Sequence, residues 1–274
     1  MGKIKRRLVR QAEREERNRP PRPRLNPPVE EWSGDLPERA EDCGFPPKLI
    51  RVNELNDVWM EIPRYVSFGW GGMWPMALLT IIPLIISLFF LILPDRASII
   101  TDWFVFGPCT FFTWSFFTYA LKMMLFEPRG APVRFNRKRQ KVYVYEFQKS
   151  FLPWRRWHSV IKVFDWKDIY GEWVMRRAHA DWGHRIYCAV CKPGTLDVVD
   201  RFILTWTVGG IDEAGGLWSF CLHYMEKKPV PTAPRYRDKP RDWTPFRTVR
   251  WPEDVARESS TAPEPLPSDT KDGK

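Results

Sequence analysis

The residues with the greatest chemical potential in this sequence are one closely spaced pair of cysteines and four histidines. Cys188 and Cys191 form a C-x-x-C pattern, which in other proteins supplies half of a zinc site or a redox pair. The sequence contains no second pair of this kind, and side chains three positions apart on a strand point to opposite faces. We therefore expect packed or free thiols, and we keep a ligand set of His179, His184 and Cys188 as the alternative.

The histidines give little support for catalysis. His179 and His184 lie in the stretch RRAHADWGHR, which we expect to form the solvated tip of a β-hairpin. A catalytic base needs an orienting partner and a cleft, and the sequence has no nucleophile elbow, no Gly-rich phosphate loop and no H-E-x-x-H motif. We predict a protein without enzymatic activity, catalytic residues, a bound metal or a cofactor.

Two long apolar blocks lie before the part of the chain that carries these residues. Residues 73–93 are mostly apolar and include no charged side chain. A membrane-spanning helix needs about 20 consecutive apolar residues. A second uncharged block covers 103–121 and ends at Lys122. The short connection makes two helices antiparallel, so we predict a transmembrane hairpin at 70–126 with spans 73–93 and 103–122. A buried core helix is the alternative, but the first block is apolar on every side.

Basic residues flank the blocks unequally. The stretch FEPRGAPVRFNRKRQK after the second block has six basic residues and one Glu, whereas the connection between the blocks has one Arg and two Asp. The positive-inside rule therefore predicts that both termini are cytoplasmic. The formal net charge of +10 also raises the question of nucleic acid. Because much of the excess lies in this flank and in the N-terminal segment, and no known motif is present, we expect no nucleic-acid partner.

The remaining segments divide by composition. Prolines and charges dominate at both ends of the sequence, which is typical of disorder. We predict a disordered basic, Pro-rich tail at 1–47, a juxtamembrane segment at 48–69 and a Pro-rich tail at 229–274. In the last tail, Trp243, Phe246 and Trp251 could dock on the domain or serve as a linear motif for a partner, and we expect disorder from Arg257 onward.

Between the second apolar block and the last tail, apolar and polar residues alternate with the period of two that is typical of β-strands. We expect a β-rich domain at 131–228, with six strands followed by an amphipathic helix that begins after Gly210. The expected strands are 133–135, 142–145, 159–164, 169–175, 185–190 and 198–206. This order predicts a cytoplasmic pleckstrin-homology-like (PH-like) β-roll with a C-terminal helix, and a generic α+β domain is the alternative. The fold class is then an α+β membrane protein.

Basic and aromatic residues of this domain are the candidates for binding lipid or a partner. The candidates are Arg134, Arg137, Lys138, Arg139, Lys141, Trp154, Arg155, Arg156 and Trp157. The basic run close to the membrane exit favours a topology signal with nonspecific contact to anionic lipid. Binding of a phosphoinositide-like or protein ligand is the second interpretation, and simple packing of the two tryptophans is a third.

Two short motifs carry a resemblance to a known family. Residues 135–143 read F-N-R-x-R-x-x-V-Y, and residues 166–169 read W-x-D-I. With the two apolar blocks, residues 45–228 resemble uncharacterised two-pass membrane proteins of proteobacteria found among type VI secretion and effector loci. The resemblance implies the bacterial inner membrane and an effector–immunity or secretion context, and it carries over no catalytic residue.

These observations lead to one leading function and two alternatives. We expect a protein-binding module anchored in the inner membrane, which acts as an immunity or accessory protein towards a toxin or secretion component. The first alternative is a lipid-sensing or scaffolding PH-like membrane protein, and the second is a membrane-acting toxin. The expected partners are the lipid bilayer and an effector or secretion protein, and homo-oligomerisation is left open.

Overall fold

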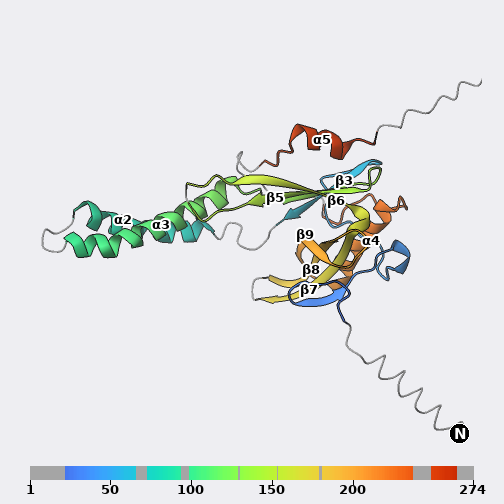
Figure 1. Ribbon diagram of the computed structural model, residues 1–274, viewed down its shortest axis with the longest axis horizontal. Helices are drawn as coiled ribbons and strands as arrows, with labels where there is room; N and C mark the ends of the chain where they lie inside the picture. Colours follow the sequence, from blue (N-terminus) through green and yellow to red (C-terminus); the bar gives the residue numbers. More distant parts are fainter. Residues whose placement is uncertain are drawn as a thin grey trace, which may run out of the picture.

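The computed structural model describes residues 22–65, 73–93, 99–128, 130–152, 154–178, 181–236 and 248–263. Two long helices project from one end of a domain built from two β-sheets (Figure 1). The helices are α2 (Met73–Ile92), α3 (Ile99–Phe126), α4 (Ile211–Met225) and α5 (Glu253–Ser260), with 3-10 turns η1 (Ala40–Asp42) and η2 (Trp166–Asp168). The strands are β1 (Trp32–Asp35), β2 (Glu54–Leu55), β3 (Trp59–Tyr65), β4 (Gly130–Asn136), β5 (Lys141–Gln148), β6 (His158–Asp165), β7 (Ile169–Ala178), β8 (Asp181–Cys191) and β9 (Val198–Val208).

Both sheets are antiparallel. One has the order β2-β3-β4-β5-β6 and the other the order β1-β7-β8-β9. Their inner faces and helix α4 share one core, in which Val133, Phe135, Ile186 and Trp218 are almost fully buried. The six strands and the helix expected at 131–228 are therefore confirmed, because alternation with period two placed every second side chain in this core.

In the sequence, the long helices lie between two strands that are direct neighbours in the sheet. Strand β3 ends before α2, β4 begins after α3, and the two strands pair from Trp59 with Asn136 to Tyr65 with Gly130. The five-stranded sheet is thus interrupted in sequence and continuous in space. A domain confined to 131–228 is wrong, because β1, β2 and β3 come from residues before the helices.

The N-terminal segment is folded where the structure describes it. Residues 22–47 were predicted to be part of a disordered tail, yet Leu25, Val29 and Leu36 are buried, and β1 pairs with β7. These apolar residues lie singly among prolines and polar residues, so the sequence shows no periodic pattern there. In the structure Leu36 packs in the main core, and Leu25 packs against Ala189 and Cys191 of β8. Within the expected juxtamembrane segment, residues 54–65 likewise form β2 and β3. Residues 1–21 and 66–72 lie outside the described parts.

The C-terminal segment is also folded in part. Residues 248–263, from the expected Pro-rich tail, contain α5, and the Ser259 side chain is fully buried. Helix α5 contacts β4. Its docking depends on polar contacts that composition alone does not predict, as described below. Residues 237–247 and 264–274 are not among those described.

One buried arginine joins the two sheets. Arg64, near the end of β3, donates from Nε to the Ala131 carbonyl (2.9 Å), from one terminal nitrogen to the Ile203 carbonyl (3.1 Å), and from the other to the Tyr145 carbonyl. Burial lowers the pKa of Arg64 to about 10, with Glu146 and Cys188 opposing that shift, so the side chain is charged at neutral pH. Because β4 and β5 belong to one sheet and β9 to the other, Arg64 fixes the sheets to each other beside the base of the helices.

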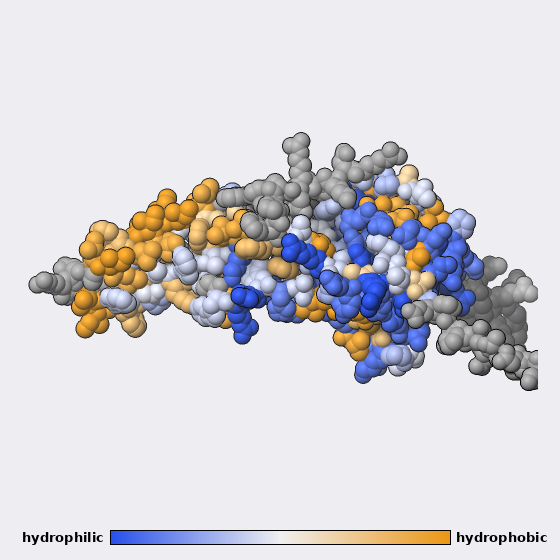
Figure 2. All heavy atoms as spheres, turned by 90° about the horizontal axis from the view of Figure 1, so that it is seen from above, coloured by the Kyte–Doolittle hydropathy of each residue, from blue (hydrophilic) through white to orange (hydrophobic). Residues whose placement is uncertain are grey.

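Helices α2 and α3 pack against each other and leave most of their apolar surface open. Phe90 stacks on Phe106 at 4.5 Å between ring centroids, and Ala77 packs with Ala120 and Met124. Only 17% of Pro75–Ile92 is buried. Apolar side chains gather on these helices and polar ones on the two-sheet domain (Figure 2). Both helices are long and apolar enough to cross a membrane, as the sequence predicted.

Replacing Arg64 with alanine should loosen the junction between the sheets. The change leaves three carbonyl oxygens without their donor, and we expect a loss of about 2–4 kcal/mol of local stability. In detergent-purified full-length protein, buried Cys188 should then react with a maleimide at least about tenfold faster, measured by peptide mass spectrometry. The exposed Arg250→Ala serves as the matched control. Equal rates in both variants would contradict the role given to Arg64.

Candidate functional site

The residues predicted to bind lipid or a partner fall at opposite ends of the five-stranded sheet. Strand β5 begins next to the β4–β5 turn and ends beside the last turn of α3, where Lys149 pairs with Glu127 at 2.6 Å. Eight strand residues span about 25 Å. The first group consists of Arg134, Arg137, Lys138, Arg139 and Lys141 at or near the β4–β5 turn. The second consists of Trp154, Arg155, Arg156 and Trp157 near α3.

The first group lies away from the apolar helices. We expected these residues close to the membrane exit, but β4 runs for seven residues, about 23 Å, directly away from α3. Arg137 forms an ion pair with Asp57 and donates from Nε to the Asp57 carbonyl (2.7 Å). Lys138 is exposed on the turn. Proximity in sequence was misleading because the strand carries the charges to the far end of the domain.

Arg134 binds residues of its own chain on the outer face of the sheet. Its guanidinium lies 4.5 Å from the ring centroids of both Trp59 and Trp251. Arg134 Nε also donates to Glu61 Oε2 at 2.6 Å, and Trp251 Nε1 donates to the same oxygen at 3.2 Å. These contacts hold residue 251 of the C-terminal segment, defined as residues 248–263, against β3 and β4.

Two further members of the first group, Arg139 and Lys141, hold the remainder of the C-terminal segment together with Asn136 and Tyr143. Glu258 accepts from Lys141 Nζ (3.1 Å) and from the Tyr143 hydroxyl (3.0 Å). Asn136 Nδ2 donates to the carbonyls of Ser259 and Thr261, at 3.0 and 2.9 Å, and Arg139 also donates to Thr261. The hydrogen bond from Lys141, followed by that from Tyr143, lowers the pKa of Glu258 despite its partial burial.

The second group lies along α3 in the segment that joins β5 to β6. This segment, residues 149–157, places Phe151 and Trp157 against Tyr119, at 6.0 and 5.3 Å between ring centroids. Lys122 Nζ donates to the Arg155 carbonyl at 3.1 Å. The β5–β6 segment therefore packs beside the polar end of α3 through aromatic rings and one charged hydrogen bond.

Within the β5–β6 segment, neighbouring side chains point in different directions along α3. The Trp154 ring, 66% exposed, lies 6.0 Å from Phe111 beside the uncharged part of the helix. Arg156 instead lines a hollow of about 450 Å³ together with Phe126 in the last turn of α3. An apolar ring is thus directed toward the free end of the helices and a cation toward the domain.

Sequence reasoning missed the residues that complete this hollow. Besides Arg156 and Trp157 it is lined by Lys122, Phe126, Pro128, Tyr145, Phe147 and Thr248. They come from α3, β5 and the C-terminal segment, so no local pattern groups them. The one available signal was Lys122, a single cation at the end of an apolar block.

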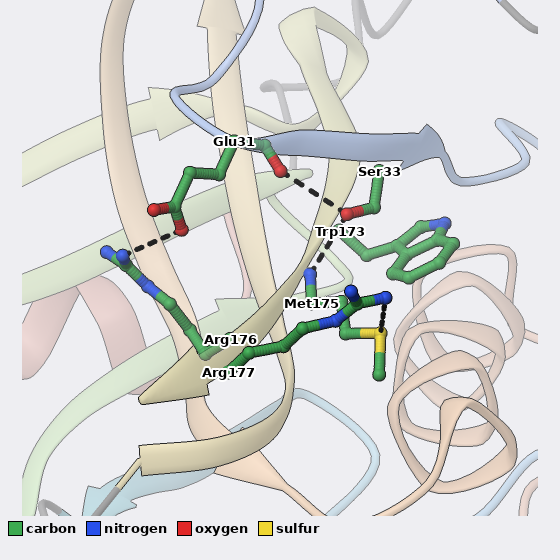
Figure 3. A pocket seen from close by; sticks show the side chains of 6 residues that line it. All are labelled: Glu31, Ser33, Trp173, Met175, Arg176 and Arg177. Carbon is green, nitrogen blue, oxygen red and sulfur yellow. Dashed lines mark hydrogen bonds and ion pairs between the residues drawn. The ribbon is translucent and has the colours of Figure 1, made fainter. Parts of the chain in front are cut away.

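A second hollow lies between β1 and β7 (Figure 3). Glu31 pairs with Arg176 at 2.8 Å, and Ser33 Oγ accepts from the Met175 amide at 3.0 Å. Trp173 and Arg177 complete its lining. The acidic group is already paired and the hydroxyl already accepts a hydrogen bond, so the contacts are those of a strand junction and supply no nucleophile beside a base.

The cysteine pair is packed on opposite faces of β8. Cys188 lies in the main core, whereas Cys191 packs with Leu25 and Ala189. Burial is the largest influence on both thiols and raises the pKa of each, so both are protonated at neutral pH. In the described parts of the chain, no three potential metal ligands come together. His184 packs on Trp173, and His179 is not among the described residues.

Comparison with known proteins gives one match. A model of a family of unknown function (DUF6708) matches residues 110–248, from within α3 through β9 and α4. No curated protein and no solved structure matches the chain.

The C-terminal segment should detach as the pH falls. Because the folded pKa of Glu258 lies below its ordinary value of 4.5, its contribution is complete above pH 4.5 and is lost as the pH falls through the folded pKa. Amide hydrogen exchange of residues 253–262, corrected for the intrinsic rate, should show full protection at about pH 5.5 and falling protection once the pH is lowered below 4.5, toward about pH 3.5.

The variant Glu258→Gln should have weak protection at both pH values, because a neutral amide cannot pair with Lys141. The exposed Glu253→Gln should retain the pH dependence of the original protein. An unchanged pH dependence in Glu258→Gln would show that another group controls docking.

Proposed function

The chain belongs to the family of unknown function DUF6708, and we propose that it is a two-pass membrane protein that holds a binding domain at the cytoplasmic face of the bacterial inner membrane. The observation that carries the proposal is the uncovered apolar surface of α2 and α3. Each Leu, Ile or Phe near the centre of a span favours insertion by a few tenths of a kcal/mol, whereas in water the same surface would drive aggregation.

The dimensions of α3 support a complete crossing. Its 28 residues extend about 42 Å, which is the thickness of a bilayer with its headgroup regions. The β5–β6 segment contacts α3 from Lys122 to Phe111, so it then lies within the cytoplasmic leaflet and its Trp154 ring reaches toward the middle of the bilayer. Trp154 faces the hydrocarbon, and Arg156 reaches back to the headgroups in the manner of a snorkelling side chain.

We further propose that the two-sheet domain is PH-like. The four strands β3–β6 lie side by side in chain order in one sheet, and the three strands β7–β9 do so in the other. Helix α4 follows them in the chain and packs against β8 and β9. Strands β1 and β2 extend the two sheets, and the helical pair interrupts the first strand connection. A PH-like domain supplies a rigid support for binding surfaces, which fits a protein that works by contact.

The partner-binding role rests on the outer face of the sheet. The motif F-N-R-x-R-x-x-V-Y covers the β4–β5 turn, and within it Asn136 and Arg139 donate to carbonyls of the C-terminal segment. A surface that holds one peptide segment by main-chain contacts is suited to hold others. With the resemblance to proteins of type VI secretion loci, this supports an immunity or accessory protein that binds an effector or secretion component.

A lipid-sensing function is the second candidate. It is favoured by the β5–β6 segment, which brings Trp154 and Arg156 to the level of the leaflet. The first candidate is preferred because it gives a partner to the outer face of the sheet, to which lipid sensing assigns no ligand.

Cysteine labelling in spheroplasts should show a complete crossing with a cytoplasmic domain. Thr101→Cys, at the start of α3, should react with a membrane-impermeant maleimide from outside. Thr195→Cys, in an exposed turn of the domain, should react only after lysis. Both are threonine replacements of exposed residues, so each serves as the matched control for the other. If neither reacts before lysis, the helices enter the bilayer without crossing it.

The protein partner should be found by cross-linking in the native strain. Tagged full-length protein should capture a neighbour-encoded protein, and the double variant Asn136→Ala/Arg139→Ala should capture at least about fivefold less, because it loses the donors of the outer face. The exposed Lys192→Ala provides the control. Capture of no neighbour-encoded protein, with unchanged sensitivity to kin contact after gene deletion, would refute the immunity role.

A further inference from the structure

The hollow beside the end of α3 combines a cationic rim with an aromatic lining. Lys122 and Arg156 contribute the positive charges, and Phe126, Phe147 and Trp157 contribute rings. The carboxylates next to lining residues along the chain are already paired, Glu127 with Lys149 at 2.6 Å and Glu146 with Lys162 at 3.0 Å. In the described part of the chain no carboxylate pairs with Arg156. The two charged side chains that line the hollow are therefore both cations, which suits an anion.

The position of the hollow defines where that anion would come from. Lys122 is the first charge after the apolar stretch of α3, and its ammonium is held over the β5–β6 segment by the Arg155 carbonyl. Phe126 is 45% exposed and lies one turn further toward the domain. Both residues line the hollow, so it lies beside the end of the apolar stretch of α3, at the level where headgroups surround a spanning helix.

The chemistry of the lining fits a phosphodiester with its adjoining glycerol. A guanidinium binds phosphate oxygens with two parallel hydrogen bonds, and an ammonium adds a mobile point charge. The rings of Phe147 and Trp157 offer apolar contact to the glycerol and to the first methylene groups of an acyl chain. A volume of about 450 Å³ accommodates a headgroup and excludes a complete lipid, whose chains would lie along α3.

We propose that this hollow binds the phosphate headgroup of one phospholipid of the cytoplasmic leaflet, between Lys122 and Arg156. The inference rests on the proposed membrane insertion of α2 and α3 and adds a defined lipid site to it. Bound lipid would join α3 to the β5–β6 segment and so set the height of the domain above the bilayer.

Native mass spectrometry of the detergent-purified full chain tests the proposal. With added dioctanoyl phosphatidylglycerol, one retained adduct is expected, and Arg156→Gln should reduce its fraction about tenfold. Arg155→Gln removes a neighbouring cation whose side chain does not line the hollow, and it should leave the adduct unchanged. Glycerol 3-phosphate at the same concentration should give no adduct.

Three results would overturn the lipid site. Equal losses in Arg155→Gln and Arg156→Gln would show nonspecific attraction to a basic surface. Adducts with glycerol 3-phosphate would show a site for soluble anions, and absence of a retained lipid would show no site. Alkaline carbonate extraction separates this failure from that of the proposed function: a chain that stays in the membrane but retains no lipid loses the site alone, whereas an extracted chain loses both.

Discussion

The pairing of β3 with β4 is the constraint on which the rest of the structure depends. Seven residue pairs, from Trp59 with Asn136 to Tyr65 with Gly130, join the strands that enter and leave the helical pair. The two helices therefore begin and end at adjacent points of one sheet, and their common base cannot separate without breaking that sheet. Arg64 strengthens the same place, because it ties the β4 and β5 carbonyls to a carbonyl of β9.

In the membrane protein proposed above, this constraint turns the apolar hairpin into an oriented anchor. A long tail between helices and domain would leave the domain free to rotate, whereas a paired sheet at the base fixes which face meets the bilayer. The β5–β6 segment lies on that side and contacts Tyr119 and Lys122 of α3. The outer face with the C-terminal segment begins near the same base and runs away from it along β4 and β5. One end of the domain is thus suited to lipid and its far end to a peptide.

Much of this arrangement could be predicted from the sequence, and the reasons for success and failure are physical. The apolar blocks and the six strands were found because each imposes a period or a length on neighbouring residues. The part played by 22–65 was missed because β1 and β2 are short and gain their stability from distant partners, as Trp32 does from Val174. The basic run near Arg137 was placed wrongly, since the direction of a strand cannot be read from its charges.

The candidate site, too, could be predicted from the sequence only in part. Trp154 and Arg156 were predicted to suit a bilayer interface from their types alone. Their opposite directions along α3, and the role of Phe147, follow from packing between elements distant in sequence. Docking of Trp251 on the domain was one of two expectations, and its ring does pack against Arg134. The residues from Arg257 onward were taken as disordered because proline and charge dominate their composition, yet Glu258 binds Lys141. Polar docking of this kind leaves no periodic trace in a sequence.

The account stands on the position of the helical pair in the bilayer, which electron paramagnetic resonance measures directly. Spin labels at Phe104, Phe112, Trp154 and Thr195 would be compared in liposomes for collisions with oxygen and with a water-soluble nickel chelate. The account predicts that oxygen dominates at the first three positions and the chelate at Thr195. Dominance of the chelate at Phe104 and Phe112 would contradict it, because the apolar surface of α3 would then face water or protein.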